Sequence, residues 1–214
     1  MNIRKAKVED LKIIAECHQK AFPKSLSSAM GVTYLMKMLE WYLRDERAFL
    51  FYIEENNKYV GYCGGLKHDG KTQFGSASSM IQHSFNAAVK AMLMHPWLFV
   101  HPEFVSKYKL TLKNIWKRLK GSSKTSAPKA PPLKTPIEPH AGLIVIGVDP
   151  AYQGKGFGSK LLQEFETVSK EMGFHKLMLT VKSENAQAIK SYQRNGWYIV
   201  SDDGKSVAMD KDIH

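Results

Sequence analysis

The sequence predicts a single-domain α/β (α+β) fold in which strands and helices alternate along the second half of the chain. A continuous apolar run at 143–148 predicts a buried strand, and apolar residues at helical spacing over 161–172 predict the helix that follows. A second strand and helix are expected at 177–181 and 185–195, before a closing hairpin. A length of 214 residues with 43% hydrophobic content suits one domain with a substantial core.

The first half of the chain predicts a strand, two helices and a hairpin, in that order. The strand is expected at 3–6, and apolar residues at helical spacing predict one helix over 10–20 and another over 32–42. A serine-rich loop separates the two helices. Strands expected at 48–53 and 59–64 flank a short polar turn, which is typical of a hairpin.

A glycine-rich turn joins the strand ending at Val148 to the helix that follows, and it reads Gln153-Gly154-Lys155-Gly156-Phe157-Gly158. Such a turn directs successive backbone N–H groups and a helix N-terminus toward one point, where an anion is favoured. The spacing differs from the Gly-x-Gly-x-x-Gly of dinucleotide-binding folds, and Lys155 is not followed by the Ser or Thr of a Walker loop. The turn therefore predicts a binding site for a ligand that carries a pyrophosphate.

A second signature begins at Asn185 and follows the pattern Asn-x-x-Ala-x-x-x-Tyr-x-x-x-Gly-aromatic, which ends at Gly196 and Trp197. Asn185, Ala188 and Tyr192 fall on one face of the expected helix. Asn185 and Tyr192 are then roughly 10 Å apart along its axis. Gly196 suits the end of the helix.

The two patterns together resemble the GNAT acetyltransferase superfamily, whose loop reads Gln-x-x-Gly-x-Gly as Gln153, Gly156 and Gly158 do here. The resemblance covers about a third of the chain, and the order of elements in the first half is similar to that family too. It implies a GNAT fold, with a mixed, mostly antiparallel central sheet flanked by helices. It also implies transfer of an acetyl group from acetyl-CoA, the co-substrate, to a primary amine, with no metal.

The resemblance also implies the residues that would bind coenzyme A. Backbone N–H groups near Ile146 and Val148 would hold the pantetheine arm, with Asn185 holding one of its amides. Tyr192 would protonate the departing thiolate, although a packed structural tyrosine is the alternative. The loop would hold the pyrophosphate through its backbone and one lysine charge, at Gln153, Gly154, Lys155, Gly156, Phe157 and Gly158.

The general base is not supplied by the family pattern. Several relatives carry a Glu on the strand before the loop, and the corresponding position here is Gly142. Strand alternation places His140 on the same face as Gly142, and an imidazole has a suitable intrinsic pKa near 6.5. Glu138 lies two residues earlier. His140 and Glu138 are therefore the candidate bases, and a water chain from backbone carbonyls with no dedicated base is the alternative.

The most unusual part of the sequence is a basic segment at 67–137, which carries 12 Lys and Arg against 2 Asp and Glu. Compact GNAT domains have a short connection here, so we expect a helical insertion between the third and fourth strands. The segment 80–119 predicts two or three helical pieces broken near His95-Pro96 and His101-Pro102, and 121–139 predicts a Pro/Ser/Lys-rich tether.

Three roles for the insertion can be considered from sequence. Two remain open: a helical cap with its lysines in water, and a contact with an anionic membrane surface. The third, binding of nucleic acid, is not expected, because no recognisable module is present. A basic wall suits an anionic acceptor, so we expect a small-molecule primary amine such as an amino sugar, including nucleotide-linked or lipid-linked forms. A protein or peptide N-acetyltransferase, and an acyl-CoA-binding module without catalysis, are the alternatives.

No run of about 18 apolar residues and no apolar signal core occur in the sequence, which favours a cytoplasmic protein. Peripheral attachment at the inner membrane surface through the basic insertion is the alternative. Cys17 and Cys63 form no ligand cluster and are expected to be buried thiols. The oligomeric state is not predicted by any pattern in the chain.

Overall fold

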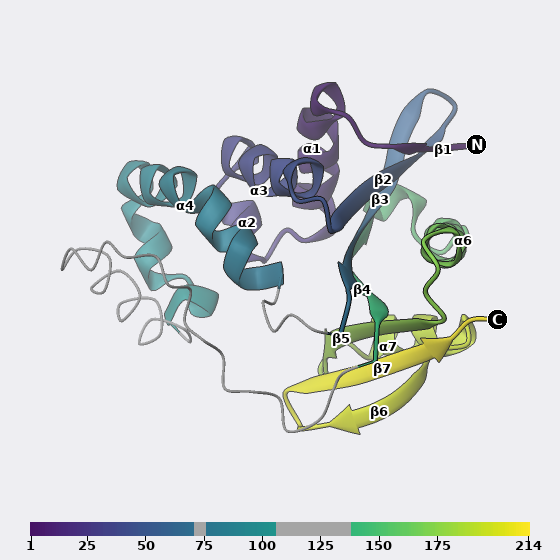
Figure 1. Cartoon of the computed structure of the whole chain (residues 1–214). Coiled ribbons are helices and arrows are strands. Elements are labelled where there is room, and N and C mark those ends of the chain that lie inside the picture. The colour runs from purple at the N-terminus through teal and green to yellow at the C-terminus, as the bar shows by residue number, and fades with distance from the viewer. Residues whose placement is uncertain (71–75, 106–137) are drawn as a thin grey trace.

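A single seven-stranded sheet organises the computed structural model, which describes residues 1–70, 76–105 and 138–214. The strand order is β1-β2-β3-β4-β5-β7-β6, and only β4 and β5 pair in parallel. The predicted mixed, mostly antiparallel sheet flanked by helices is therefore confirmed (Figure 1). The strands are β1 Asn2–Lys5, β2 Ala48–Glu55, β3 Lys58–His68, β4 His140–Val148, β5 Lys176–Lys182, β6 Tyr198–Asp202 and β7 Ser206–Asp212.

Helices cover both faces of this sheet, with α1 and α3 on one face and α6 on the other (Figure 1). A four-residue helix, α2, lies in the serine-rich loop, where no helix was predicted because its apolar residues show no repeat. The helices are α1 Leu11–Ala21, α2 Leu26–Ala29, α3 Val32–Arg44, α4 Ser76–Met94, α6 Phe157–Glu171 and α7 Ala186–Arg194, with 3₁₀ turns at Val8–Asp10, Pro96–Val100 and Pro150–Tyr152.

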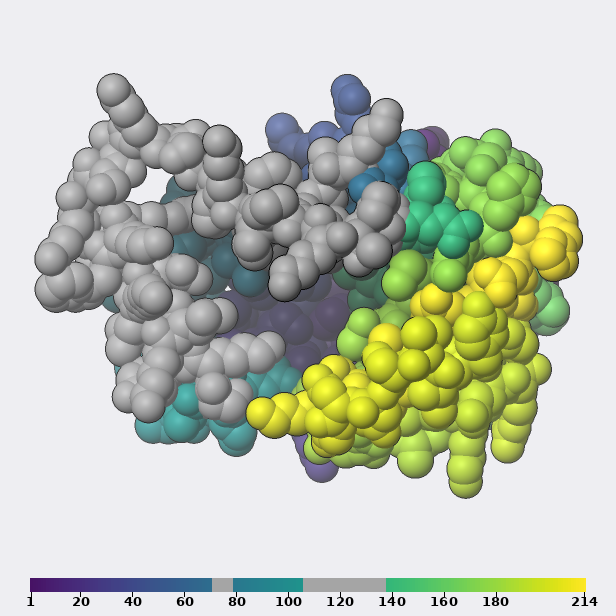
Figure 2. Space-filling model, turned by 60° about the horizontal axis from the view of Figure 1, so that its bottom comes forward, coloured from purple at the N-terminus to yellow at the C-terminus, as the bar shows by residue number. Residues whose placement is uncertain are grey.

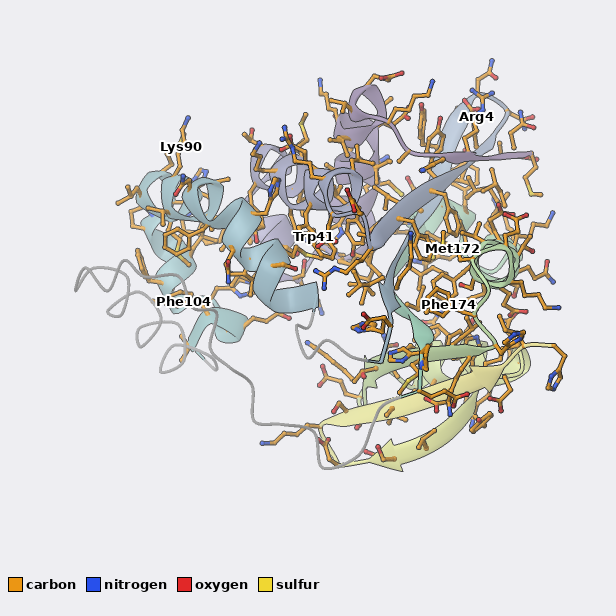
Figure 3. The ribbon with its side chains drawn as sticks, viewed as in Figure 1. Arg4, Trp41, Lys90, Phe104, Met172 and Phe174 are labelled. Atoms are coloured by element: carbon orange, nitrogen blue, oxygen red, sulfur yellow. The ribbon has the colours of Figure 1, made fainter. Side chains whose placement is uncertain are left out.

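Two apolar cores, one on each face, hold the helices to the sheet. On the α6 face, Leu161 and Phe165 are fully buried against residues of β2 to β5. On the other face, Leu35 and Leu39 of α3 pack with Leu66 of β3, and Trp41 is buried beside them (Figure 3). Burying one large apolar side chain contributes roughly 1.5–3 kcal/mol, so these stripes fix which face each helix covers.

The strands β3 and β4 are longer than predicted, and the extra length positions part of the site. β3 continues past Gly64 to His68, and β4 begins at His140 rather than at Leu143. The added residues include glycines and histidines without an apolar run, so the sequence pattern missed them. In the structure these two ends are paired, with His68 opposite His140.

The parallel strands β4 and β5 separate toward their carboxyl ends. They pair only from Ala141 and Leu177 to Leu143 and Leu179. Beyond this point β4 stays paired with β3 as far as Val148, while β5 stays paired with β7. A bulge in the β3–β4 pairing lies at the same level. The strands therefore form a splay, the opening between β4 and β5 beyond Leu143.

The described part of the insertion, residues 76–105 between β3 and β4, is helical as predicted. α4 ends just before His95-Pro96 and a second break falls at His101, because proline cannot continue a helix and restricts the residue before it. A small core of Met30, Ala91 and Leu98 joins α4 and the 3₁₀ turn to α2. Lys90 points away from this core (Figure 3), as a helical cap requires.

The remainder of the predicted helical segment, 106–119, and the tether as far as residue 137 lie outside the described residues. Among the helices that the structure describes, none combines the length and apolar character needed to cross a bilayer.

Candidate functional site

The glycine-rich loop presents bare backbone to open space. Gly154 and Gly156 have φ angles of 75° and 84°, a conformation that glycine adopts without strain. A β-carbon at either position would meet no atom within 4 Å. Gly156 is the N-cap of α6, so the first N–H groups of that helix have no partner within it. The loop and the helix N-terminus, called the cradle below, have the geometry of the anion site that the sequence predicts, and binding of an anion there stays a prediction.

Side chains of the loop hold this cradle in place. Gln153 donates from Nε2 to the carbonyl oxygen of Val148 at 3.0 Å, which ties the loop back to the end of β4. Lys155 donates from Nζ to the carbonyl of Ala151 at 3.0 Å and remains exposed. The ammonium group of Lys155 therefore lies beside the cradle and adds positive charge there.

The edge of β4 that faces the splay carries unpaired backbone donors. The N–H of Asp149 donates to the carbonyl oxygen of Val60 on β3 at 2.9 Å. Successive backbone groups along a strand point to opposite sides, so the N–H groups of Val148 and Ile146 point toward β5. In the splay these two donors lie between the loop and the middle of the sheet, where an extended amide-bearing ligand could accept from them.

Asn185 is the N-cap of α7, whereas the sequence spacing predicted that it lies within the helix. Its Oδ1 accepts from the N–H of Ala188 at 3.1 Å, and the side chain is exposed. The capping bond uses one of the side-chain groups, while Nδ2 retains its two donors. Asn185 therefore stabilises the start of α7 whether or not it also binds a ligand.

Tyr192 lies in the middle of α7 and is partly buried against the core on the α6 face. Its ring centre is 6.1 Å from that of Trp197, which immediately precedes the following strand, β6. Burial, with a smaller contribution from the Cys63 thiol, raises the pKa of the Tyr192 hydroxyl to about 12. The hydroxyl is therefore protonated at neutral pH and can act as a proton donor.

Comparison with known proteins gives a family match for the part of the chain that contains the loop and Tyr192. Residues 129–197, which contain the glycine-rich loop and all of α7, match the Acetyltransferase (GNAT) family. About a third of the chain therefore matches the GNAT family in sequence. The match spans the two patterns on which the sequence resemblance rests.

Individual GNAT relatives differ in how much of this chain they cover. A mycothiol acetyltransferase from Propionibacterium freudenreichii is 35% identical over 65 residues, which is 30% of this chain and 21% of that protein. This chain thus matches about a fifth of the length of that relative.

Solved structures match over nearly the whole chain at low identity, and this likeness concerns the fold. The PaiA N-acetyltransferase of Thermoplasma acidophilum, solved with coenzyme A, gives a TM-score of 0.57 at 14% identity, over 99% of this chain and 98% of its own. The ribosomal-protein-S18-alanine N-acetyltransferase of Escherichia coli gives 0.52 at 17% identity, over 99% and 93%.

The two residues predicted as general bases occupy different environments in the structure. His140 is buried, donates from Nδ1 to the carbonyl oxygen of Glu138 at 2.8 Å, and stacks on His68. The carboxylate of Glu138 is exposed and pairs with Lys176 of β5 at 3.5 Å. Sequence reasoning missed His68, because its proximity depends on the register of β3 against β4.

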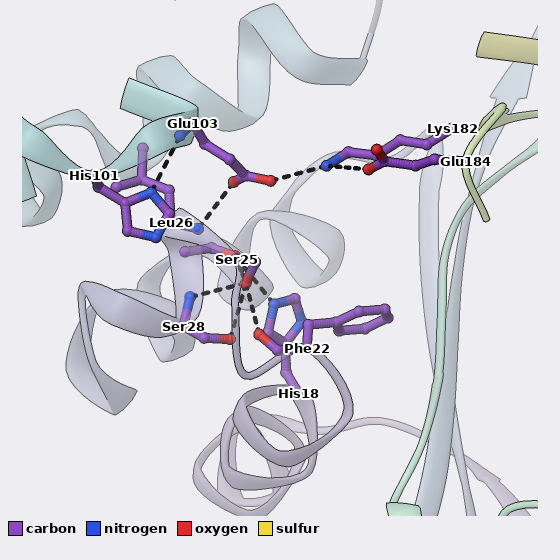
Figure 4. Close-up of polar contacts among 10 residues, drawn as sticks. His18, Phe22, Ser25, Leu26, Ser28, His101, Glu103, Lys182 and Glu184 are labelled. Atoms are coloured by element: carbon purple, nitrogen blue, oxygen red, sulfur yellow. Dashed lines mark hydrogen bonds and ion pairs between the residues drawn. The ribbon is translucent and has the colours of Figure 1, made fainter. Parts of the chain in front are cut away.

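A polar wall lies on the α1 side of the site, at the turn between α1 and α2. His18 is buried, bonded to the hydroxyls of Tyr62 and Ser27, and burial lowers its pKa to about 4, which keeps it neutral. Ser25 caps α2 and bonds to the hydroxyls of Ser27 and Ser28 (Figure 4). This wall is therefore uncharged and rich in hydroxyl groups.

Glu103 connects three segments that are distant in the sequence (Figure 4). Its carboxylate accepts from the N–H of Leu26 at 2.9 Å and pairs with Lys182, at the end of β5, at 3.2 Å. The space-filling view shows the N-terminal residues recessed between the insertion and the C-terminal strands (Figure 2). Glu103 therefore tethers the insertion to both the α2 turn and the rim of the splay.

Proposed function

We propose that this GNAT protein transfers an acetyl group from acetyl-CoA to the primary amine of a small molecule. The observation that carries the proposal is that the glycine-rich loop directly follows the strand whose free N–H groups face the splay. The anion cradle at Gly154 and Gly156 suits the pyrophosphate, and the N–H groups of Ile146 and Val148 suit the pantetheine. Tyr192, protonated at neutral pH, lies on the α6 face where it suits the sulfur.

In the proposed reaction, the lone pair of a neutral amine attacks the thioester carbonyl carbon of the substrate acetyl-CoA. A C–N bond forms and the C–S bond breaks, with the bonding electrons leaving on sulfur. Tyr192 donates its phenolic proton to that sulfur, and the proton lost by the amine nitrogen must pass to a base. Backbone N–H groups at the splay would stabilise the negative charge that develops on the carbonyl oxygen.

For the acceptor, we propose an amine that carries several hydroxyl groups, such as an amino sugar. The partly exposed hydroxyls of Ser25 and Ser27 offer uncharged hydrogen-bonding groups to such a molecule, and the buried, neutral imidazole of His18 holds Ser27 in place. The name of the mycothiol acetyltransferase relative is compatible with a small-molecule acceptor, whereas that of the S18-alanine enzyme favours a protein amine. A protein or peptide acceptor is therefore the alternative.

Thermal unfolding with and without acetyl-CoA, desulfo-CoA and ATP tests the proposed co-substrate. A ligand at about 100 times its dissociation constant stabilises by roughly 2.7 kcal/mol, equivalent to about 5 to 10 °C for a chain of this size. Both coenzyme A compounds should produce this shift and ATP should not. The absence of a shift with either compound would overturn the proposal. Thiol release with a panel of glucosamine, spermidine and an alanine-starting peptide then tests the acceptor class.

We also propose that the insertion contacts an anionic membrane surface. Bulky apolar side chains are exposed together around the end of α4 and the turn after it: Leu93, Met94, Trp97, Phe99 and Val100. The segment 67–137 carries most of the net positive charge of the chain. Exposed aromatic and aliphatic groups next to basic sequence favour the interface of a bilayer that contains anionic lipid.

A further inference from the structure

Two histidines form a stacked pair at the end of β3 and the start of β4. His68 and His140 are cross-strand partners, with ring centres 4.6 Å apart and planes inclined by 16°. His140 is buried and His68 is half-buried. Two cationic rings at this distance would repel each other, so the arrangement favours at least one neutral imidazole.

The pair lies on the face of the sheet opposite Tyr192. Leu66, two residues before His68, is buried in the core under α1 and α3, so alternation along β3 places His68 on that face. A β-carbon at Gly142 would lie 3.6 Å from Nε2 of His68. The Nε2 edge therefore lies against β4 at Gly142, one residue before the last pair that β4 forms with β5.

The surroundings of His68 keep its ring neutral. Burial lowers its pKa below the ordinary 6.5, and the neighbouring His140 and Arg47 lower it further, while the carboxylate of Asp69 opposes them. His140 donates from Nδ1 to the carbonyl of Glu138, so in its neutral form the proton is fixed on that nitrogen. A neutral His68 ring can accept a proton at pH 7.

Given the acetyl transfer proposed above, we propose that His68 is the proton acceptor of the reaction and that His140 is a positioning residue. As the amine lone pair forms the C–N bond, the proton leaving nitrogen passes to His68, directly or through one water. The C–S electron pair leaves on sulfur, which takes the proton of Tyr192. Protonated His68 then releases its proton to solvent and deprotonated Tyr192 takes one up, so the cycle needs no other reactant.

The geometry favours His68 over His140 and Glu138, the two bases predicted from the sequence. His140 is 8% exposed and is covered by the ring of His68. The carboxylate of Glu138 pairs with Lys176 on β5. Of the three groups, only His68, at the end of β3, combines partial exposure with a ring that lies against Gly142 of β4, near the start of the splay.

The test uses the full chain and measures thiol release from acetyl-CoA between pH 5.5 and 9 with the most active amine of the panel above. His68→Gln should lower kcat, measured at saturating amine so that protonation of the free amine does not contribute, by about 100-fold. It should also remove the acid limb, in which the wild-type rate falls as His68 becomes protonated. Coenzyme A affinity, measured by calorimetry, should not change. His140→Asn should move the acid limb without removing it. His83→Gln, on α4, is the matched control and should behave as wild type.

A second variant pair addresses the position of the base. The backbone of Gly142 accepts a β-carbon at ordinary contact distance. His68→Ala should be inactive, and addition of Gly142→Glu should restore part of the rate with an acid limb at lower pH, because a carboxylate then replaces the imidazole.

The outcomes separate this inference from the proposed function. A wild type that releases thiol, together with a His68→Gln variant that keeps its rate within threefold and its acid limb, would overturn the role of His68 alone. Loss of coenzyme A affinity in His68→Gln would also overturn it, since the residue would then be structural. A wild type that releases no thiol with any amine overturns the acetyl transfer, and the assignment of His68 with it.

Discussion

The proposed cofactor side and the proposed acceptor side of the site are built in different ways. The cofactor side, β4 to α7, is one contiguous stretch whose binding groups are backbone N–H donors at a glycine-rich loop and a helix start. The acceptor side joins the α1–α2 turn, the insertion and the end of β5 through the side chain of Glu103. A contiguous backbone site is encoded by local spacing, whereas a site assembled from distant segments depends on how they pack.

The largest effect is expected from placing a negative charge in the cradle. Gly158 lies in the first turn of α6 with a helical φ, and a β-carbon there would meet only Val148, at 4.0 Å. Gly158→Glu should therefore fold normally yet weaken coenzyme A binding by about 100-fold, or about 2.7 kcal/mol. Gln163→Glu, exposed on the same helix, adds the same charge away from the cradle and should bind normally. Equal affinities by calorimetry would break the assignment of the cofactor side.

A smaller but more selective effect is expected at Tyr192. Tyr192→Phe keeps the packing against the α6-face core and removes the proton donor, so kcat should fall by about 100-fold or less while coenzyme A affinity is retained. The acid form of this tyrosine is the active one, and its pKa of about 12 means that it causes no loss of rate between pH 7 and 9. A variant that turns over as fast as wild type would show instead that the hydroxyl has no part in catalysis, as in a coenzyme A-binding module.

The smallest effect is expected from substitutions in the insertion, which lie outside the proposed cofactor side and change only membrane binding. Trp97→Ala with Phe99→Ala removes two exposed rings and should weaken binding to vesicles containing anionic phosphatidylglycerol by about tenfold, or about 1.4 kcal/mol. Coenzyme A affinity should stay unchanged in this variant. The matched control is Val8→Ala, an exposed apolar residue far from the insertion in sequence. Binding that is unaffected by the two ring deletions, or absent in wild type, would remove the membrane contact.

Much of the fold could be predicted because its elements carry clear local signals. The apolar run at 143–148, the stripe on α6 and the proline breaks after α4 each agree with the structure. The α2 helix and the ends of β3 and β4 could not be predicted from such signals. The turn of α2 depends on the cap by Ser25, and the strand ends depend on pairing with each other.

The sequence by itself determined the proposed cradle, because left-handed glycines and a helix start are properties of neighbouring residues. Only the tertiary structure decided which groups face the acceptor. The sequence placed His140 and Glu138 near the site, but cross-strand register put His68 over Gly142 and buried His140 beneath it. Glu103 likewise meets Leu26 and Lys182 only after the insertion packs on α2. Contacts between residues far apart in the chain leave no spacing for a sequence to display.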